Sequence, residues 1–553
     1  MTSHPTVLCK EGLHAICLPF RLHSNNREVD FDSKAFNAAL GGANWERLTA
    51  QNETDIRWDR LQNYQAKAYF HPFVRSFLYE GNLVRRYRRG DISKFDVAVD
   101  STATGQQTVS LTVKRCELTL FQPDIGVLLL ELELTEPLPL QLLQLVMDTL
   151  RRIYPPYFDC FSPHVDASTN NDDTAKKDTW VSGHCPVSVS VFNSNKHAIC
   201  AESTNFRNHT ADFTQPYLEV LEKPSDPDSP PQSPWAPHWR HVLSPFVDDG
   251  EFQAISLGDD RAPTLSWLAM EKPREISRGD WMRLCFADAP GNDSLPYAKE
   301  FATDFEKRFC YDRYWYKRHE STDGPSRILN CGYAFAYVGD ASDKYFFTKR
   351  ENGGHATFRH IYIQMGVIAH FQHAALLAAS QRLSTLIKRE NGSVCLPDTS
   401  KVKEFYEHFI SFTQTYWFDE ITPQEQGREL FQMWRTHLRL QEQYDEIRQE
   451  LKDLVDYTEL KASKLLNDKL KDVAIAGLII AFVALLIGLA SLGAGIFGMN
   501  EAEQLQSLAN VPLGPLTRTG LYVAGFLMIA VVVTAGWLIK THRLFRKPRG
   551  NRR

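Results

Sequence analysis

An asparagine at the edge of a predicted membrane span is the residue with the clearest chemical role in this sequence. Asn500 closes the tripeptide Gly498-Met499-Asn500, which directly follows 25 uncharged residues, 473–497. A second uncharged run of 20 residues, 520–539, comes after a short connection. As helices the two runs measure roughly 37 and 30 Å, and a bilayer core is about 30 Å thick. Two spans joined by a short loop with an amide at the membrane edge are typical of a subunit of a membrane pore.

The charges around these runs predict the orientation of the chain in the membrane. Lysines precede the first run and seven Lys or Arg residues follow the second, whereas the loop holds Glu501 and Glu503 against one arginine, Arg518. Positive charge stays on the cytoplasmic side, so we expect both termini in the cytoplasm and the acidic loop outside. The N-terminus shows no signal-peptide pattern, and ten scattered cysteines fit a reducing cytosol. The sequence predicts a multi-pass protein of the plasma (inner) membrane.

A stripe of mostly small residues runs along the first span. They recur every three or four positions, which places them on one helix face. Two spans cannot enclose an aqueous path, so a homo-oligomer with one span of each copy around an axis is expected. Small residues also let helices pack closely, and both roles, packing and lining, stay open. The stripe consists of Gly477, Ile480, Ala484, Gly488, Ser491 and Gly495.

The residues before the spans predict a cytosolic body that begins with an α/β domain over 1–345. A Pro- and Asp-rich linker near 225–237 suggests two subdomains. Strand-forming residues at 108–119 and 127–134, separated by a turn at Pro123, indicate a hairpin. Further elements are expected as a helix at 140–153 and as a last pair of strands at 328–338 and 345–348.

From 355 onward the pattern is helical. Two helices are expected within 355–420, at 356–388 and 401–418, and a stalk helix at 421–472 that continues without interruption into the first span. Within the stalk, apolar residues follow heptad-like spacing from Leu440 to Leu465. Such a seam needs a partner, either the preceding helices or copies of itself. The remaining segments are the spans 473–497 and 520–540, the external loop 498–519 and the basic tail 541–553.

These C-terminal features resemble the CorA family of divalent-cation channels, whose architecture also occurs in a zinc-transporting branch. The similarity rests on the stalk, the paired spans, Phe497-Gly498-Met499-Asn500 and the topology, and covers roughly residues 420–545, about a quarter of the chain. It implies a homopentamer with a cytosolic funnel. It also implies that Asn500 belongs to a ring at the outer mouth, that Gly498 and Met499 support this ring, and that Ser491 faces the pore.

The chemistry of an asparagine ring suits a hydrated cation, with Mg²⁺ as the first candidate and Zn²⁺, Co²⁺ and Ni²⁺ as others. Mg²⁺ releases its waters reluctantly, and neutral amide oxygens accept hydrogen bonds from these waters without holding the ion too tightly. Glu501 and Glu503, repeated in every copy, would raise the local cation concentration. The small-residue stripe gives Ile480 and Gly488 as further pore positions. No cofactor is expected beyond the transported ion.

The large body admits an alternative, a CorA-like membrane effector that a cytosolic nucleotide-like ligand opens. Arg85, Arg86, Arg88 and Arg89 form a candidate site for such an anionic ligand, although a charged surface is the more common role of such a run. A candidate regulatory cation site comprises Asp248, Asp249, Asp259 and Asp260, and the competing interpretation is a solvated acidic loop.

Other functional classes find little support in the sequence. The mild net charge of −5 gives no reason to expect a nucleic-acid partner. No nucleophile elbow, P-loop or dinucleotide fingerprint appears, so an enzyme is not expected. His370 and His373 lie one helical turn apart and could share a metal, but such pairs are more often packed or solvated.

Overall fold

A computed structural model describes most of the chain up to Gln504. The chain divides into two units, Met1–Lys452 and Asp453–Arg553. The expected second span 520–540, the tail 541–553 and most of the linker 225–237 lie outside the described residues. The described ranges are 7–24, 29–49, 64–80, 84–101, 105–161, 179–182, 184–195, 197–198, 235–247, 250–291, 297–315, 325–386, 388–390, 393–395 and 399–504.

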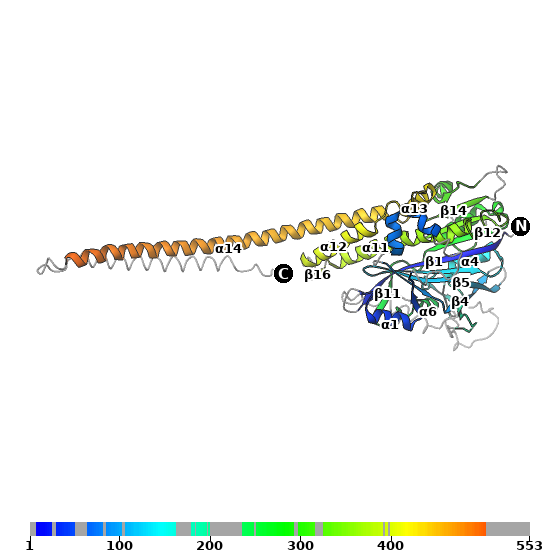
Figure 1. Cartoon of the computed structure of the whole chain (residues 1–553), viewed down its shortest axis with the longest axis horizontal. Helices are drawn as coiled ribbons and strands as arrows, with labels where there is room; N and C mark the ends of the chain where they lie inside the picture. Colours follow the sequence, from blue (N-terminus) through cyan, green and yellow to red (C-terminus); the bar gives the residue numbers. More distant parts are fainter. Residues whose placement is uncertain are drawn as a thin grey trace, which may run out of the picture. The chain divides into compact units, whose positions relative to one another are not determined.

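The first unit is an α/β domain built on one mixed sheet of 13 strands among the described residues (Figure 1). Neighbouring strands pair antiparallel except β12 and β15, which are parallel. The main path runs β10 (Ser188–Asn193), β4 (Ile92–Ser101), β5 (Gly105–Phe121), β6 (Ile125–Leu134), β1 (Leu8–Ser24), β12 (Thr264–Met270), β15 (Ala334–Asp340), β14 (Ser326–Asn330) and β13 (Cys310–Tyr311). Off this path, β11 (Phe252–Ser256) and β7 (Leu138–Pro139) pair with β1, β3 (Val84–Arg89) pairs with β5, and β2 (Trp45–Arg47) pairs with β3.

Helices cover both faces of this sheet, because both faces of its central strands are apolar. Along β12, Leu268 and Met270 pack in one cluster with residues of α4 (Leu140–Leu150) and α7 (Arg278–Phe286). Residues of alternate parity point to the other face. There Leu265 approaches Gly366 of α11 (Ile363–Leu386) so closely that a Cβ atom on the glycine would lie 2.5 Å from it. The domain therefore has three layers, helix, sheet and helix.

The expected hairpin is confirmed by β5 and β6, which pair antiparallel with Leu118 opposite Leu128. The expected helix at 140–153 corresponds to α4, and the one at 401–418 to α12 (Thr399–Tyr416). The helix expected at 356–388 is α10 (Gly354–Thr357), the π-helical turn η3 (Phe358–Tyr362) and α11 in succession.

The pair of strands expected at 328–338 and 345–348 was placed incorrectly. The strands are β14 and β15, whereas 345–348 forms a turn. The Asp343 carboxylate causes this, because it accepts hydrogen bonds from the backbone N–H groups of Phe346 and Phe347 at 2.9 and 3.2 Å. A carboxylate that binds the backbone locally competes with strand pairing.

The expected stalk helix 421–472 is two helices, α13 (Glu425–His437) and α14 (Leu440–Gln504). They are separated at Arg439, whose φ of 54° lies in the left-handed region. Leu438 and Leu440 on either side are both buried. Burial of these two leucines favours the break, although neither proline nor glycine marks it.

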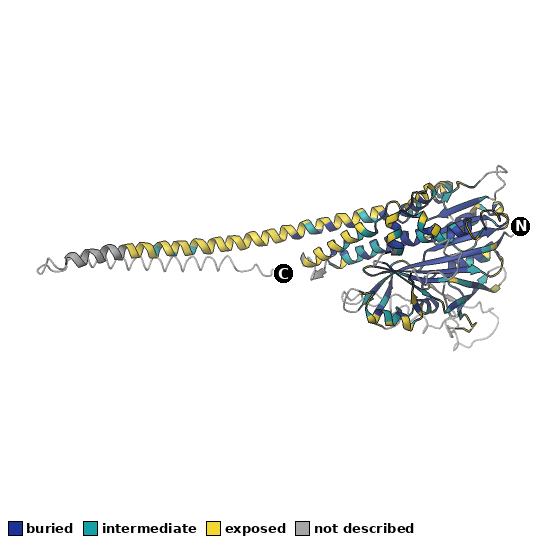
Figure 2. Ribbon diagram, viewed as in Figure 1, coloured by how far each residue is buried: buried dark blue, intermediate teal, exposed yellow. Residues whose placement is uncertain are grey.

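Helix α14 has 65 residues, which corresponds to about 97 Å. Near its start, Tyr444 stacks on Trp417 with ring centroids 4.6 Å apart and on Phe409 at 5.6 Å. The apolar seam is buried at Ile447 and Leu451, whereas Leu465 is 56% exposed (Figure 2). The predicted seam thus packs within the single chain only in its first part.

Candidate functional site

Among the described residues, two helices are long and apolar enough to cross a membrane, by length and composition. The helical run Gly354–Leu386 has 89% of its most apolar window buried, so it serves as a core helix of the α/β domain. In α14, over Leu440–Leu492, none of the most apolar stretch is buried. This exposure makes α14 the candidate membrane segment, and α14 contains the span predicted at 473–497.

The side chains of this segment are described up to Leu492. Ile480 is 69% exposed, and no described residue lies within 4 Å of the position that a Cβ atom would occupy on Gly477 or Gly488. Within the part of the chain that the structure describes, no packing contact therefore requires a glycine at these two positions. Ser491 donates a hydrogen bond from Oγ to the Ile487 carbonyl oxygen at 2.8 Å, which leaves the acceptor capacity of its hydroxyl oxygen.

The predicted mouth residues lie on the same helix. The α14 backbone continues through Gly498, Met499 and Asn500 and through Glu501 and Glu503 before it ends at Gln504. The external loop expected to start at 498 therefore begins with helical residues. Gly498 therefore lies inside the helix and not at its end.

The four arginines proposed for an anionic ligand lie on β3 and do not converge. Successive strand residues point to opposite faces, so Arg85 and Arg89 share one face and Arg86 and Arg88 the other. Each is paired within the chain. Arg85 donates to both oxygens of the Asp32 carboxylate, at 3.1 and 2.6 Å.

Arg89 is the most completely enclosed of the four. Its side chain is 3% exposed and donates to both carboxylate oxygens of Asp91, at 3.0 and 2.7 Å. It also donates to the carbonyl oxygens of His241 and Val242, at 2.8 and 3.2 Å. These contacts fix the strand to the segment behind it, which is a structural role.

The remaining two arginines, Arg86 and Arg88, both donate hydrogen bonds to Glu117. Arg88 donates to one of its carboxylate oxygens at 2.6 Å and Arg86 to the other at 3.3 Å. Burial would raise the pKa of Glu117, but Arg86, Arg115 and Arg88 outweigh it and lower that pKa to about 2. A buried carboxylate that is fully ionised at neutral pH keeps both arginines engaged.

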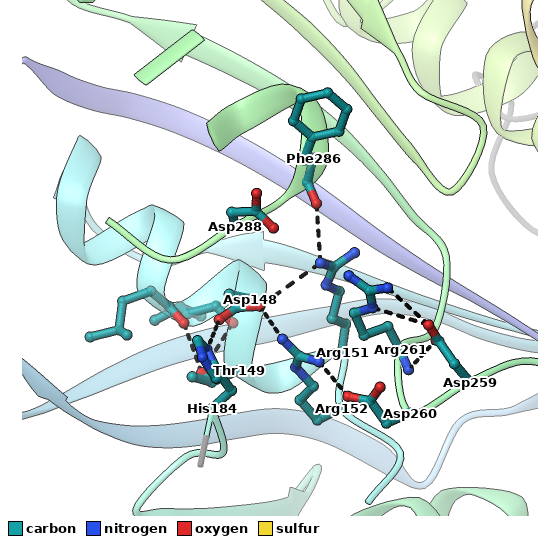
Figure 3. A network of polar contacts seen from close by, with 12 residues as sticks. Asp148, Thr149, Arg151, Arg152, His184, Asp259, Asp260, Arg261, Phe286 and Asp288 are labelled. Atoms are coloured by element: carbon teal, nitrogen blue, oxygen red, sulfur yellow. Dashed lines mark hydrogen bonds and ion pairs between the residues drawn. The ribbon is translucent and has the colours of Figure 1, made fainter. Parts of the chain in front are cut away.

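Two aspartates of the candidate cation site belong to a network of polar contacts at the end of α4 (Figure 3). Asp260 forms an ion pair with Arg152, and Asp259 accepts from Arg261 at 2.9 Å. Arginines therefore already neutralise the carboxylates that a cation was expected to neutralise. Asp248 and Asp249 lie outside the described residues.

The centre of this network is Asp148, a buried residue on α4. It accepts from Arg152 at 2.8 Å, and His184 lies 2.9 Å from its second oxygen. Its hydrogen bond with His184 raises the pKa of that imidazole. Arg151, also buried, donates to the Phe286 carbonyl oxygen at 3.1 Å and so joins α4 to the end of α7 (Figure 3).

The histidine pair on α11 is buried. His370 and His373 are 1% and 5% exposed, and burial lowers their pKa values to about 3 and about 4. No group of three or more metal-ligating side chains occurs among the described residues. Neutral imidazoles packed beside the Tyr333 ring fit a core role.

The sequence interpretation missed the network around Asp148, because its members are separated by up to about 140 positions. The one local signal is the spacing of Asp148 and Arg152, which are four positions apart on a predicted helix and so can form an ion pair. Comparisons of the whole chain with family models, with curated proteins and with solved structures find no match.

Proposed function

We propose that this chain is a subunit of a CorA-like channel or transporter for divalent cations in the plasma (inner) membrane. The observation that carries the proposal is the part of α14 from Val473 onward, which is uncharged up to the tripeptide of Asn500 and has its most apolar stretch exposed among the side chains described, up to Leu492. Exposure of large apolar side chains to water on such a helix is unfavourable, and insertion into a lipid bilayer removes these side chains from water. Both termini lie in the cytoplasm in this proposal, and the second span is 520–540.

In the proposed pore, α14 of each copy in a homopentamer lines the axis. Ile480, Gly488 and Ser491 contribute to the lining, and their exposure in the single chain leaves them available for it. Asn500 forms the ring at the outer mouth. Its amide oxygen accepts hydrogen bonds from the waters of Mg²⁺, and Glu501 with Glu503 raises the cation concentration.

Ion flux into proteoliposomes that contain the purified full chain tests this proposal. We expect uptake of at least one of Mg²⁺, Zn²⁺, Co²⁺ and Ni²⁺ above that of empty liposomes, measured with an enclosed metal-sensitive dye. The order of the four rates identifies the preferred ion. Correctly inserted protein without flux of any of them, at both low and high internal Mg²⁺, would refute the proposal.

A second candidate is a membrane effector of the same architecture that opens when the body binds a ligand. The observation that favours it is the stacking of Tyr444, at the start of α14, on Phe409 of α12. A ligand that moves α12 would therefore act on the helix that carries the pore. The four arginines of β3 do not supply the binding site, since each is paired within the chain, and an effector requires another site in the body.

A further inference from the structure

We infer that a cavity at the junction of β1, α11 and α12 is a binding site for a small organic anion. The cavity has a volume of about 480 Å³, which is within the usual range for small-molecule sites. Its charged lining residues come from the end of β1, from the turn between β5 and β6, from the last turns of α11 and from the first turns of α12. They include Arg21, Asp124, Arg382, Lys401 and Glu404.

The two guanidinium groups are held in place by one buried carboxylate. Asp124, 6% exposed, accepts from Arg21 Nε at 2.8 Å and forms an ion pair with Arg382. Within the part of the chain that the structure describes, no other side-chain hydrogen bond occurs at either guanidinium. A guanidinium carries several N–H donors in a planar fork, so most donors of both arginines are available at the cavity. Planar forks of this kind match carboxylate and phosphate groups.

The charge of the lining favours an anion. Arg21, Arg382 and Lys401 oppose Asp124 and Glu404, so the permanent charges leave one excess positive charge. Burial, followed by the nearby Arg21, lowers the pKa of the lining His23, which is therefore neutral. A larger, open cavity along α13 differs, because the charges of its arginines and carboxylates cancel. These residues are Arg308, Arg428 and Arg439 against Asp419, Glu420 and Glu429.

An apolar cleft of about 50 Å³ adjoins the charged cavity. It shares Asp124, Arg382 and Phe405 with the cavity and extends to Phe371 and Phe412. A ligand that binds the arginines can therefore hold an apolar or aromatic part in the larger cavity, against Phe405 at the edge of this cleft. The site thus suits an organic molecule with a phosphate or carboxylate group better than a bare inorganic ion.

The position of the cavity on α12 connects it to α14. Lys401, Glu404, Phe405 and His408 lie at the spacing of one helix face, and all line the cavity. Phe409 follows directly and stacks on Tyr444 of α14. Regulation of a pore by this ligand rests on the proposed function, whereas binding at the cavity does not.

Calorimetric titration of the detergent-solubilised full chain tests the site with three probes: phenyl phosphate, benzoate and inorganic phosphate. We expect saturable binding of phenyl phosphate or benzoate, tighter than that of inorganic phosphate, and the better of the two identifies the anionic group. Lys401→Gln and Arg382→Gln should each weaken binding of the better probe at least tenfold. Lys403→Gln is the matched control, because Lys403 is on the same helix, 75% exposed and outside the cavity, and it should bind as the wild type does.

Arg382→Gln removes a partner of buried Asp124 and could fail to fold, in which case Lys401→Gln decides the outcome. Absence of saturable binding by both organic probes would overturn the inference, and so would wild-type affinity in Lys401→Gln. Since binding is measured without flux, a failed flux assay leaves this result unaffected. Hydrogen exchange of α12 and of the first turns of α14 with and without the probe would then test the connection to α14, with slower exchange expected on binding.

Discussion

Arg359 donates a hydrogen bond from Nε to Oε1 of Glu131 at 2.6 Å, and this contact joins the π-helical turn η3 to the middle of strand β6. Arg115 of β5 donates to the second oxygen at 3.0 and 2.6 Å. Glu131 has no exposed surface. Burial alone would raise its pKa, but Arg115 and Arg359 outweigh burial and lower it. One buried carboxylate thus connects a helix layer to the sheet.

Replacing Glu131 with glutamine should lower the free energy of unfolding by about 3 kcal/mol or more, because two arginines lose their buried counter-charge. The lowered pKa means that ionised Glu131 stabilises the fold above the ordinary value of 4.5 and that this stabilisation is lost as the pH falls below it. Stability of Glu131→Gln should therefore decline less toward acid pH. Urea unfolding of the solubilised chain at several pH values measures both effects. A loss below about 1 kcal/mol at pH 7 would contradict the prediction.

Arg89 and Arg88 should respond differently to the same substitution. Arg89→Gln leaves Asp91 and two backbone carbonyl groups without their donor, and we expect a loss of about 3–5 kcal/mol. Arg88 is 41% exposed, and Arg86 still pairs with Glu117, so Arg88→Gln should cost about 1 kcal/mol. Unfolding midpoints measure the difference. Equal, small losses would show that Arg89 is not a structural residue.

The two parts of the α14 seam should have separable effects. Leu465→Glu places a charge at an exposed position, so it should weaken self-association without unfolding the α/β domain. Leu451→Ala removes a buried side chain and should cost about 2–5 kcal/mol in stability. Light scattering in detergent reports the mass of the wild type, for which we expect a homopentamer. A wild-type monomer, or an unchanged mass in Leu465→Glu, would argue against assembly through the seam.

Asn500→Ala and Asn500→Asp should each abolish or strongly reduce flux while assembly persists. Alanine offers no acceptor for the hydration shell of the ion, and five aspartates would hold a divalent cation too tightly for rapid release. Ala502→Ser is a matched control on the same helix, two positions away, and should keep wild-type flux. The proteoliposome assay measures all three. Normal flux in assembled Asn500→Ala would show that Asn500 does not form the ring at the outer mouth.

Elements with local patterns could be predicted from the sequence. The β5–β6 hairpin has strand-forming runs on both sides of a Pro-Asp turn. The helical run that ends with α11, and the separate helix α12, lie where helices were predicted. The apolar part of α14 could be predicted from its run of uncharged residues alone, without knowledge of the tertiary structure. In each case the determining interactions lie within a few residues of each other.

Features that depend on distant partners could not be predicted. Arg382 meets Asp124 across 258 positions, and Arg89 reaches His241 across 152, so the composition of either segment alone does not identify its role. The break at Arg439 also has no local signal, because burial of Leu438 and Leu440 outweighs a left-handed conformation that is unfavourable for arginine. The charged cavity is assembled from four segments and has no motif.

The central place of β1 in the sheet has a consequence for synthesis of the chain. β1 precedes the other described strands of the sheet in the chain, yet one of its edges pairs with β6 and the other with β11 and β12. The last residue of β12 is Met270. A nascent chain therefore keeps an open edge on an apolar strand until Met270 has left the ribosome, and an open edge invites pairing with other chains. β15, which lies parallel to β12, joins only after a further 63 residues between Met270 and Ala334. Non-local pairing of this kind folds slowly, so the α/β domain should depend on protection of its early strands during translation.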